Sequence, residues 1–528
     1  MRTLILLLFL AAQAFSQPGA AWVTRISGPG EANAIAVAPH GPLYAGGSWQ
    51  GTGTSGLDMY LARLDRITGD TVWTRYYRSA NADKIQSIAL IDSDVVAVGQ
   101  SNNQYTVLHY RADGSLRHAW RDVLHLTTGS YANAVCTDET GAAYVTGNAN
   151  DLGSSYNIIT MKFSPAGDSL WQRYYYDPAG AVADLAYGIA VDESHNCYVA
   201  GVSGSNILTI KLTSAGDTVW TRRYHGPAAG SDAGYAVALD KDGNVYVAGE
   251  TNITGAKAAC VLSYSPAGTL RFAKTYASPA KLGDSFSAIA IDGDQNVIAV
   301  GTARTGQYLQ ATLTAKYSSG GDSIWARTYR PTTADASLGA QVALDTAGNI
   351  FVTGQSRTGD FDVTTLAYGP SGSPSWDTSY SGAGSYDDYG RDIAVDDSGF
   401  VFTAAAVMQS ASVSDFTVLC YTQLITSVEG SQQIPPDRPR LHQNFPNPFN
   451  PTTKLRYSIP GSTSGEPPNV RIAVYDMLGR EVALLVNERT SPGTFEIRFD
   501  GSRLSSGIYF CRLTAGGFTE TRSLALVR

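Results

Sequence analysis

The sequence has little of what would crosslink the chain, charge one face strongly or carry it through a membrane. It contains only five cysteines, and this odd, dispersed set is not a disulfide framework. Charged residues make up 16% of the chain and the formal net charge is −8, with no run of lysine or arginine, which argues against nucleic acid as the main partner. After the N-terminal segment, no stretch approaches the roughly 18 consecutive apolar residues of a membrane-spanning helix.

We interpret the cysteines as buried, small apolar side chains, and a single opportunistic bridge is the alternative. They are Cys136, Cys197, Cys260, Cys420 and Cys511. Stability must then come mainly from packing.

Sequence signatures of catalysis and metal binding are missing as well. No HExxH zinc motif and no GxSxG nucleophile elbow occurs, and the loose group of His109, His118, Asp122 and His125 lacks zinc-ligand spacing. Asp-rich turns such as residues 240–244 lack the ligand spacing and final glutamate of an EF-hand, so we interpret them as hairpin turns capped by their own aspartates. We therefore predict no catalytic residue, no cofactor and no metal site.

What the chain does have is glycine, tyrosine and a repeat. Its 54 glycines and 30 tyrosines are typical of an all-β extracellular protein. The segment Gly234 to Tyr276 returns in variant form about every 50 residues through most of the chain. Its apolar runs, separated by Gly, Asp, Asn and Pro, predict short strands at 235–239, 245–248, 260–264 and 270–276.

One spacing can be followed from repeat to repeat. The first strand ends on Asp240, and the second strand ends nine residues later on Gly249. The same pair recurs at Asp138 and Gly147, Asp192 and Gly201, Asp292 and Gly301, and Asp345 and Gly354, and in altered form in three more units. Units that contain only strands cannot each bury a core, so they must stack on one another. The sequence therefore predicts an all-β fold, an eight-bladed β-propeller.

The fourth strand of most units carries an aromatic residue four positions after a turn glycine. An aromatic on the outer strand would wedge between adjacent blades and dock them. The predicted docking residues are Trp22, Trp73, Trp120, Trp171, Trp220, Phe272, Trp325 and Trp376, although Trp120 comes two residues late in its unit.

The last unit lacks a fourth, Trp-bearing strand, and a spare strand exists at the other end of the chain. Residues 21–26 resemble residues 219–224 and lie just before the first complete unit. We infer that Trp22 lies on the outer strand of the last blade, so that the two ends of the propeller pair and close the ring. Closure would remove an open edge that could otherwise pair with other chains.

The chain is expected to divide into four parts. Residues 1–16 have the charged, apolar and cleavable regions of a secretory signal peptide. Residues 17–426 form the propeller, and 427–440 read as a semi-extended linker. Residues 441–528 hold short alternating segments that predict a small Ig-like β-sandwich.

The repeats resemble the bacterial beta-propeller repeat family, often called SBBP repeats, most clearly at residues 234–249 and 388–399. The name of that family assumes seven blades, so a seven-bladed ring is the alternative to our count. The resemblance implies an extracellular scaffold and supplies no catalytic motif.

The last domain is similar to the type A sorting domain of the type IX secretion system, which ends cargo proteins of Bacteroidota and related phyla. The matching segments are residues 443–452, 474–480, 492–495 and 506–510. The signature residues are Pro446, Pro448, Pro451, Tyr475, Asp476, Gly479, Arg480, Gly493, Gly507 and Tyr509. The resemblance implies export to the periplasm, recognition by the outer-membrane translocon and removal of the domain by a sortase. Individually, these residues can also serve only to build the sandwich.

Two kinds of function remain open. The favoured one is a secreted or cell-surface, non-catalytic scaffold whose loops bind carbohydrate or protein. The rival is a secreted hydrolase or lyase with its site at the mouth of the central channel. Residues 64–73 resemble the tryptophan-docking motif of quinoprotein dehydrogenases, but no two cysteines are adjacent as those enzymes commonly require. The sequence also matches the Asp-box motif of sialidases only in part.

Overall fold

The computed structural model describes residues 19–38, 41–51, 56–79, 81–122, 129–151, 155–177, 182–382, 384–422, 439–441, 449, 451–459, 468–490, 493–516 and 518–526. The chain divides into two compact units, the first ending at Leu424 and the second beginning at Ile425. The signal peptide expected at 1–16 and residues 427–438 of the expected linker lie outside the described residues. Within those ranges, none of the chain forms a helix with the length and apolarity needed to cross a bilayer.

The described residues of the first unit form eight antiparallel sheets of four strands, which we call blades. Seven blades are continuous in sequence: β2 (Gly30–Val37), β3 (Leu43–Trp49), β4 (Asp58–Leu64) and β5 (Thr71–Tyr77); β6 (Lys84–Ile91), β7 (Asp94–Ser101), β8 (Gln104–Tyr110) and β9 (Leu116–Arg121); β10 (Ser130–Thr137), β11 (Ala143–Asp151), β12 (Ser155–Phe163) and β13 (Ser169–Tyr175); β14 (Asp184–Val191), β15 (Cys197–Ser203), β16 (Asn206–Leu212) and β17 (Thr218–Tyr224); β18 (Ala233–Leu239), β19 (Val245–Asn252), β20 (Lys257–Tyr264) and β21 (Leu270–Tyr276); β22 (Ser285–Ile291), β23 (Val297–Arg304), β24 (Gln310–Tyr317) and β25 (Ser323–Tyr329); β26 (Ala336–Leu344), β27 (Ile350–Arg357), β28 (Phe361–Tyr368) and β29 (Pro374–Tyr380). The remaining blade combines β30 (Tyr389–Val395), β31 (Phe400–Ser410) and β32 (Val413–Thr422) with β1 (Ala20–Ile26).

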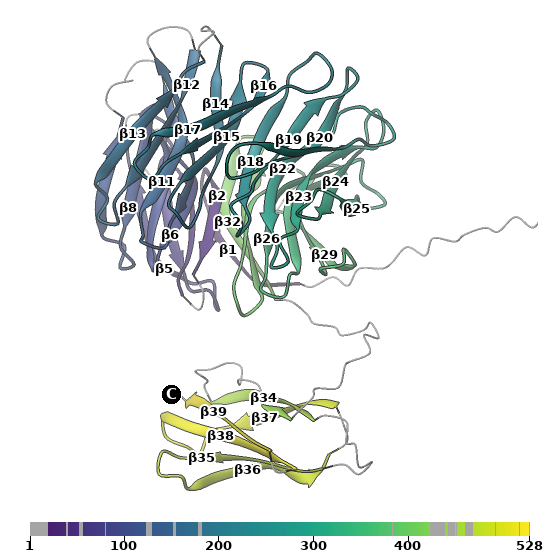
Figure 1. Ribbon diagram of the computed structural model, residues 1–528. Coiled ribbons are helices and arrows are strands. Elements are labelled where there is room, and N and C mark those ends of the chain that lie inside the picture. Colours follow the sequence, from purple (N-terminus) through teal and green to yellow (C-terminus); the bar gives the residue numbers. More distant parts are fainter. Residues whose placement is uncertain are drawn as a thin grey trace, which may run out of the picture. The chain divides into compact units, whose positions relative to one another are not determined.

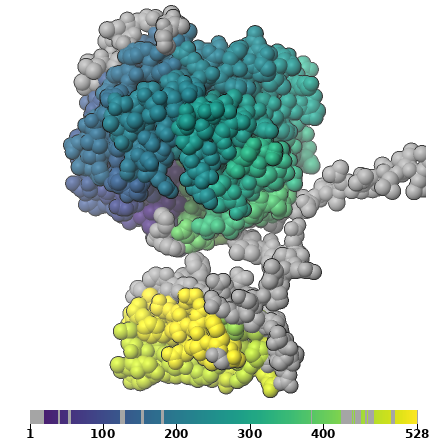
Figure 2. Space-filling model, in the orientation of Figure 1, coloured from purple at the N-terminus to yellow at the C-terminus, as the bar shows by residue number. Residues whose placement is uncertain are grey.

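The middle strands of each blade are buried on both faces. In β20 every residue after Lys257 is buried, whereas the outer strand β21 is exposed or half-buried along its whole length. Both faces of a middle strand are covered because neighbouring blades pack on them, which is why these strands read as continuous apolar runs without a polar face. In Figure 2 the side chains fill the spaces that the ribbons of Figure 1 leave between blades.

The blades form a closed ring. The first strand of each blade contacts the first strand of the next, from β2 and β6 round to β26 and β30, and β30 in turn contacts β2. Figure 1 shows the purple start and the green end of the first unit side by side, at β1, β2 and β32. The first unit is therefore a β-propeller, as the repeats predicted.

The N-terminal strand β1 is the outer strand of the last blade. It pairs antiparallel with β32, and the register places Trp22 opposite Cys420. The Arg25 guanidinium lies 2.8 Å from the Asp415 carboxylate, which is almost fully buried. Segments nearly 400 positions apart thus share one sheet, which is the placement that the spare strand at residues 21–26 led us to expect.

The second unit is a small β-sandwich. One sheet holds β33 (Arg440–Leu441), β34 (Thr452–Ile459) and β37 (Gly493–Asp500); the other holds β35 (Asn469–Tyr475), β36 (Glu481–Arg489), β38 (Gly507–Ala515) and β39 (Phe518–Leu526). Side chains from both sheets, including Leu455, Ile472 and Leu513, meet in one buried core.

All five cysteines are described and carry free thiols, four of them buried and Cys136 half-buried. They act as small apolar side chains of the blades and of the sandwich.

Candidate functional site

The outer-strand aromatics dock each blade on the next. Trp220, 6% exposed, packs over Gly268 in the turn between β20 and β21 of the following blade. A Cβ atom on Gly268 would lie 2.8 Å from the indole, and the φ of this glycine is +80°, so no other residue suits the turn. The Trp220 indole N–H also donates to the Pro266 carbonyl at 3.1 Å. The same contact recurs for Trp22 on Gly69, Trp73 on Gly114, Trp171 on Gly216, Phe272 on Gly321 and Trp325 on Gly372.

Two of the predicted docking residues contact the next blade without packing on a turn glycine. In β9 it is His118 that faces the turn glycine of the next blade, Gly167, whereas Trp120 packs against Tyr105 and Phe163. His118 pairs with His109 in the register where other blades place their tryptophan, so the nearest tryptophan in sequence was the wrong choice for this contact. Trp376, 1% exposed, packs against Phe351 of its own blade and Tyr421 of the last blade, so it docks these two blades as predicted.

An arginine that the sequence analysis did not single out completes the docking contact. Arg222, two residues after Trp220, donates from Nε to the Gly268 carbonyl at 2.6 Å, and its guanidinium carbon lies 5.5 Å from the Trp220 ring centroid. Arg75 and Arg327 make the equivalent bonds in their blades. A Trp-x-Arg pattern in these three repeats was the available signal, because each of them thereby gains a charge-assisted bond and a cation–π contact.

The Asp-rich turns are capped hairpins. Oδ1 of Asp240 accepts hydrogen bonds from the backbone N–H groups of Asp242 and Asn244, and Oδ2 accepts one from the Tyr246 hydroxyl. These bonds occupy the carboxylate, as expected for a turn closed by its own aspartate. Among the residues that the structure describes, no three His, Cys, Asp or Glu side chains are grouped so as to hold a metal ion.

The sequence analysis missed a second, buried aspartate that several of the repeats contain. Asp232 is fully buried, and its carboxylate accepts N–H bonds from Gly226 in the preceding loop and from Asn252 at the end of β19. Asp284 and Asp388 do the same in their blades. The signal was an Asp eight residues before the turn Asp, as at Asp232 and Asp240. These aspartates hold the loops on the side where the first strands begin, which we call the loop face.

The loose histidine group is part of the packing. His109 and His118 are cross-strand neighbours, and together with apolar side chains that include Val107 and Phe163 they enclose a small space. Burial lowers the pKa of His109, which favours its neutral form. His125 lies outside the described residues.

Asp392 links the last blade to the first. Its Oδ2 accepts the N–H of Ile35 on β2 at 2.9 Å, and burial raises the pKa of this carboxyl from 3.8 to about 6. Because the folded protein holds the proton more tightly than the unfolded chain, stability should fall as the pH rises from about 4 to about 6, by about 1 to 3 kcal/mol.

Asp392→Asn stays neutral and can still accept the Ile35 N–H, so it should remove this part of the pH dependence and raise stability at pH 7. Urea unfolding of both proteins between pH 4 and 7 measures the difference. If the two free-energy curves run parallel, the assignment to Asp392 is wrong.

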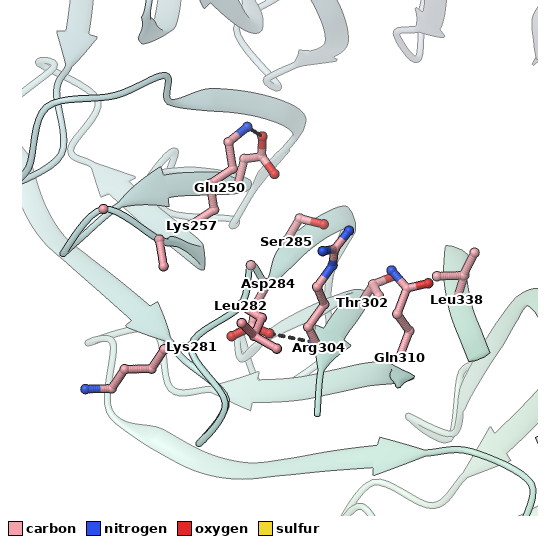
Figure 3. Close-up of a pocket in the computed structure, with 13 residues that line it drawn as sticks. Glu250, Lys257, Lys281, Leu282, Asp284, Ser285, Thr302, Arg304, Gln310 and Leu338 are labelled. Carbon is pink, nitrogen blue, oxygen red and sulfur yellow. Dashed lines mark hydrogen bonds and ion pairs between the residues drawn. The ribbon is translucent and has the colours of Figure 1, made fainter. Parts of the chain in front are cut away.

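The loop face carries a cavity of about 580 Å³ between the blades of β18–β21 and β22–β25 (Figure 3). Its lining includes Glu250, Lys257, Lys281, Leu282, Asp284, Ser285, Thr302, Arg304, Gln310 and Leu338. Glu250 pairs with Lys257 and accepts the Tyr235 hydroxyl at 3.0 Å. A volume of this size suits one or two sugar rings or a few side chains of a partner.

Strands β2 and β19 also place carboxylates on the loop face, and these are paired. Glu31 accepts hydrogen bonds from Arg391 at 3.4 Å and from Asn33 at 3.3 Å. Glu250 is neutralised by Lys257 in the same way. Such pairing occupies both carboxylates, which does not favour either of them as a catalytic group.

The sorting-signature residues of the second unit build an exposed turn and its supports. Asp476 accepts N–H bonds from Leu478 and Arg480, and the Arg480 guanidinium returns to it at 2.7 Å. Met477 and Leu478 at the tip are 70% and 78% exposed. Three other signature residues make hydrogen bonds: the Tyr475 hydroxyl accepts one from Arg471, the Tyr509 hydroxyl donates one to the Ser505 carbonyl, and the Pro451 carbonyl accepts one from the Gly501 N–H. Gly479 has a φ of +78°, and Gly493 and Gly507 begin β37 and β38. Pro446 and Pro448 lie outside the described residues.

Two family models match the chain. Residues 443–526 match the secretion system C-terminal sorting domain, and residues 219–255 match the beta-propeller repeat. The propeller match covers β17 to β19 and so includes Trp220 and the Asp240 turn. A search of curated proteins found no match.

One solved structure supports the fold. The crystal structure of Sqt1 from Chaetomium thermophilum aligns with a TM-score of 0.51 at 12% identity, over 77% of this chain and 99% of that one. A protein from Lactobacillus plantarum (TM-score 0.41, 14% identity, 64% of this chain and 95% of that one) and one of unknown function from Bacteroides caccae (0.32, 12%, 54% and 93%) are also similar. At these identities the likeness concerns the fold alone.

The chain is therefore a secreted or outer-surface protein that contains a β-propeller with an SBBP-type repeat at residues 219–255 and, at residues 443–526, a match to the C-terminal sorting domain of the type IX secretion system.

Proposed function

We propose that this protein is a non-catalytic extracellular scaffold that binds carbohydrate or protein on the loop face of its propeller. The observation that carries the proposal is the cavity of about 580 Å³ on that face, framed by loops that buried aspartates such as Asp284 hold in place. Loops on a rigid frame are where binding residues concentrate, and a fixed frame lowers the entropic cost of binding. The translocon and the sortase of the secretion system are the proposed partners of the second unit.

The test is a screen of the purified mature protein against soluble polysaccharides and surface proteins, with binding and turnover measured in parallel. We expect saturable binding of at least one class without release of products. Glu250→Gln supplies the decisive comparison, because Glu250 is a carboxylate that lines the cavity. Product formation that this substitution abolishes would replace the scaffold with the rival hydrolase or lyase. Absence of binding to every member of the panel would also contradict the proposal.

A further inference from the structure

Arg304 at the end of β23 differs from its counterpart in the next blade. Arg357 occupies the equivalent position, because it follows Ser337 by 20 residues just as Arg304 follows Asp284. The Arg357 guanidinium forms a bidentate ion pair with the Asp335 carboxylate, at 2.8 and 2.9 Å. Where the blade of Arg357 has Asp335, the blade of Arg304 has Leu282. The described part of the chain supplies no ion pair or hydrogen bond to the exposed Arg304 guanidinium, which lies in the cavity lining (Figure 3).

The other charges of the cavity leave a cationic surface for a ligand. Asp284 is 1% exposed, and its oxygens accept the N–H groups of Ser278 and Arg304, so it is not available to a bound molecule. Glu250 is held by Lys257. Among the described residues, neither Arg304 nor Lys281 has a partner carboxylate; Arg304 lies in the cavity lining, and the Lys281 side chain extends outward from the cavity edge.

The loop that carries Lys281 is built to hold this residue in place. Lys281 has a φ of +50°, a left-handed conformation that costs a side-chain-bearing residue energy and that glycine or asparagine adopts more easily. Its N–H donates to the Ser278 carbonyl at 3.0 Å, and Ser278 is tied to Asp284 and to the Arg304 carbonyl. A strained position that nevertheless carries a lysine at the cavity edge is consistent with a role for its charge.

We propose that this cavity binds an anionic polysaccharide, through a carboxylate or sulfate group on Arg304, with Lys281 as a second cation at the edge of the cavity. Ser285, Thr302 and Gln310 supply hydroxyl and amide groups for the sugar hydroxyls, and Leu282 and Leu338 supply an apolar wall. Arginine suits this role because its planar donors bond two oxygens of one anionic group. The inference rests on the proposed scaffold function and names the ligand class for the same face.

The experiment titrates the mature protein with polygalacturonate, dextran sulfate, polyglutamate and uncharged dextran at low and physiological salt, using calorimetry. We expect binding of at least one anionic polymer, weakened by salt, and no binding of dextran. Arg304→Ala should lower the affinity about tenfold or more, the usual effect of losing one charge-assisted contact. Leu282→Asp, at a side chain that is 44% exposed, should cause a similar loss because it recreates the carboxylate that neutralises Arg357.

Arg357→Ala is the matched control, since it removes an arginine from the same strand position but not from the cavity. It should leave the affinity unchanged, and circular dichroism should show all variants folded. Binding of polygalacturonate alone assigns the anionic group as carboxylate, and binding of dextran sulfate alone assigns it as sulfate; both support the site. Equal affinity of Arg304→Ala and the native protein, binding of dextran alone, or binding of polyglutamate in place of the polysaccharides would overturn it while leaving a scaffold function intact.

Discussion

A chain that lacks residues 20–26 is expected to lose the folded first unit altogether. These residues form β1, the outer strand of the last blade, and they pair along β32 from Phe416 to Tyr421. Trp22 also packs on Phe402 and over Gly69 of the first blade, so the deletion opens the last blade and the ring together. We expect a loss comparable with the whole stability of a domain, about 5–15 kcal/mol, because each blade depends on its neighbours to cover both faces.

The measurement is thermal unfolding followed by circular dichroism, with size-exclusion chromatography to detect aggregation through the open edge of β32. The matched control begins at Gly19 and keeps β1 whole. A soluble deletion variant that unfolds at the same temperature as the control would show that β1 does not close the ring.

Trp220→Ala is expected to destabilise the propeller by about 3–5 kcal/mol, the usual cost of removing a buried large aromatic. The side chain lies in a core shared by two blades, with Tyr198 on one side and Tyr264 on the other. The substitution also leaves the Pro266 carbonyl without its indole donor and Arg222 without its aromatic partner. Denaturant unfolding at pH 7 measures the change in free energy.

Trp220→Phe separates packing from hydrogen bonding. Phe272 fills the equivalent position over Gly321, so a phenyl ring is compatible with the turn glycine, and the expected loss is nearer 1 kcal/mol. An alanine variant with an unchanged unfolding midpoint would contradict the docking role.

Strand positions were largely predictable because the same pattern of apolar and turn residues recurs in several repeats. The fourth strand of the reference repeat was expected at residues 270–276, where β21 is found. The second strand was expected to end at Ala248, but β19 continues to Asn252, and Gly249 pairs with both of its neighbours, Gly234 and Cys260. Glycine was interpreted as a stop, although here it is the residue that lets the first strand pass close to the second.

The candidate binding site was not predictable to the same degree. The aspartates that hold the loops, such as Asp232, follow a spacing that is visible in the sequence but was not used. Whether an arginine is neutralised depends on a partner elsewhere in its blade. Arg357 pairs with Asp335, 22 positions away, whereas the blade of Arg304 has Leu282 at the position equivalent to Asp335. Such a difference has meaning only once the blades have been superposed.

By itself the sequence determined the all-β class, the repeat and its turns, the docking aromatics of most blades and the export domain at the C-terminus. These features depend on short spacings of apolar, turn and aromatic residues, which act locally and recur. Only the tertiary structure decided that His118 takes the place of Trp120, which aspartates hold the loops, and which cation is left to face a cavity. Each of these depends on strand register or on contacts between blades, and both arise when distant segments pack against one another.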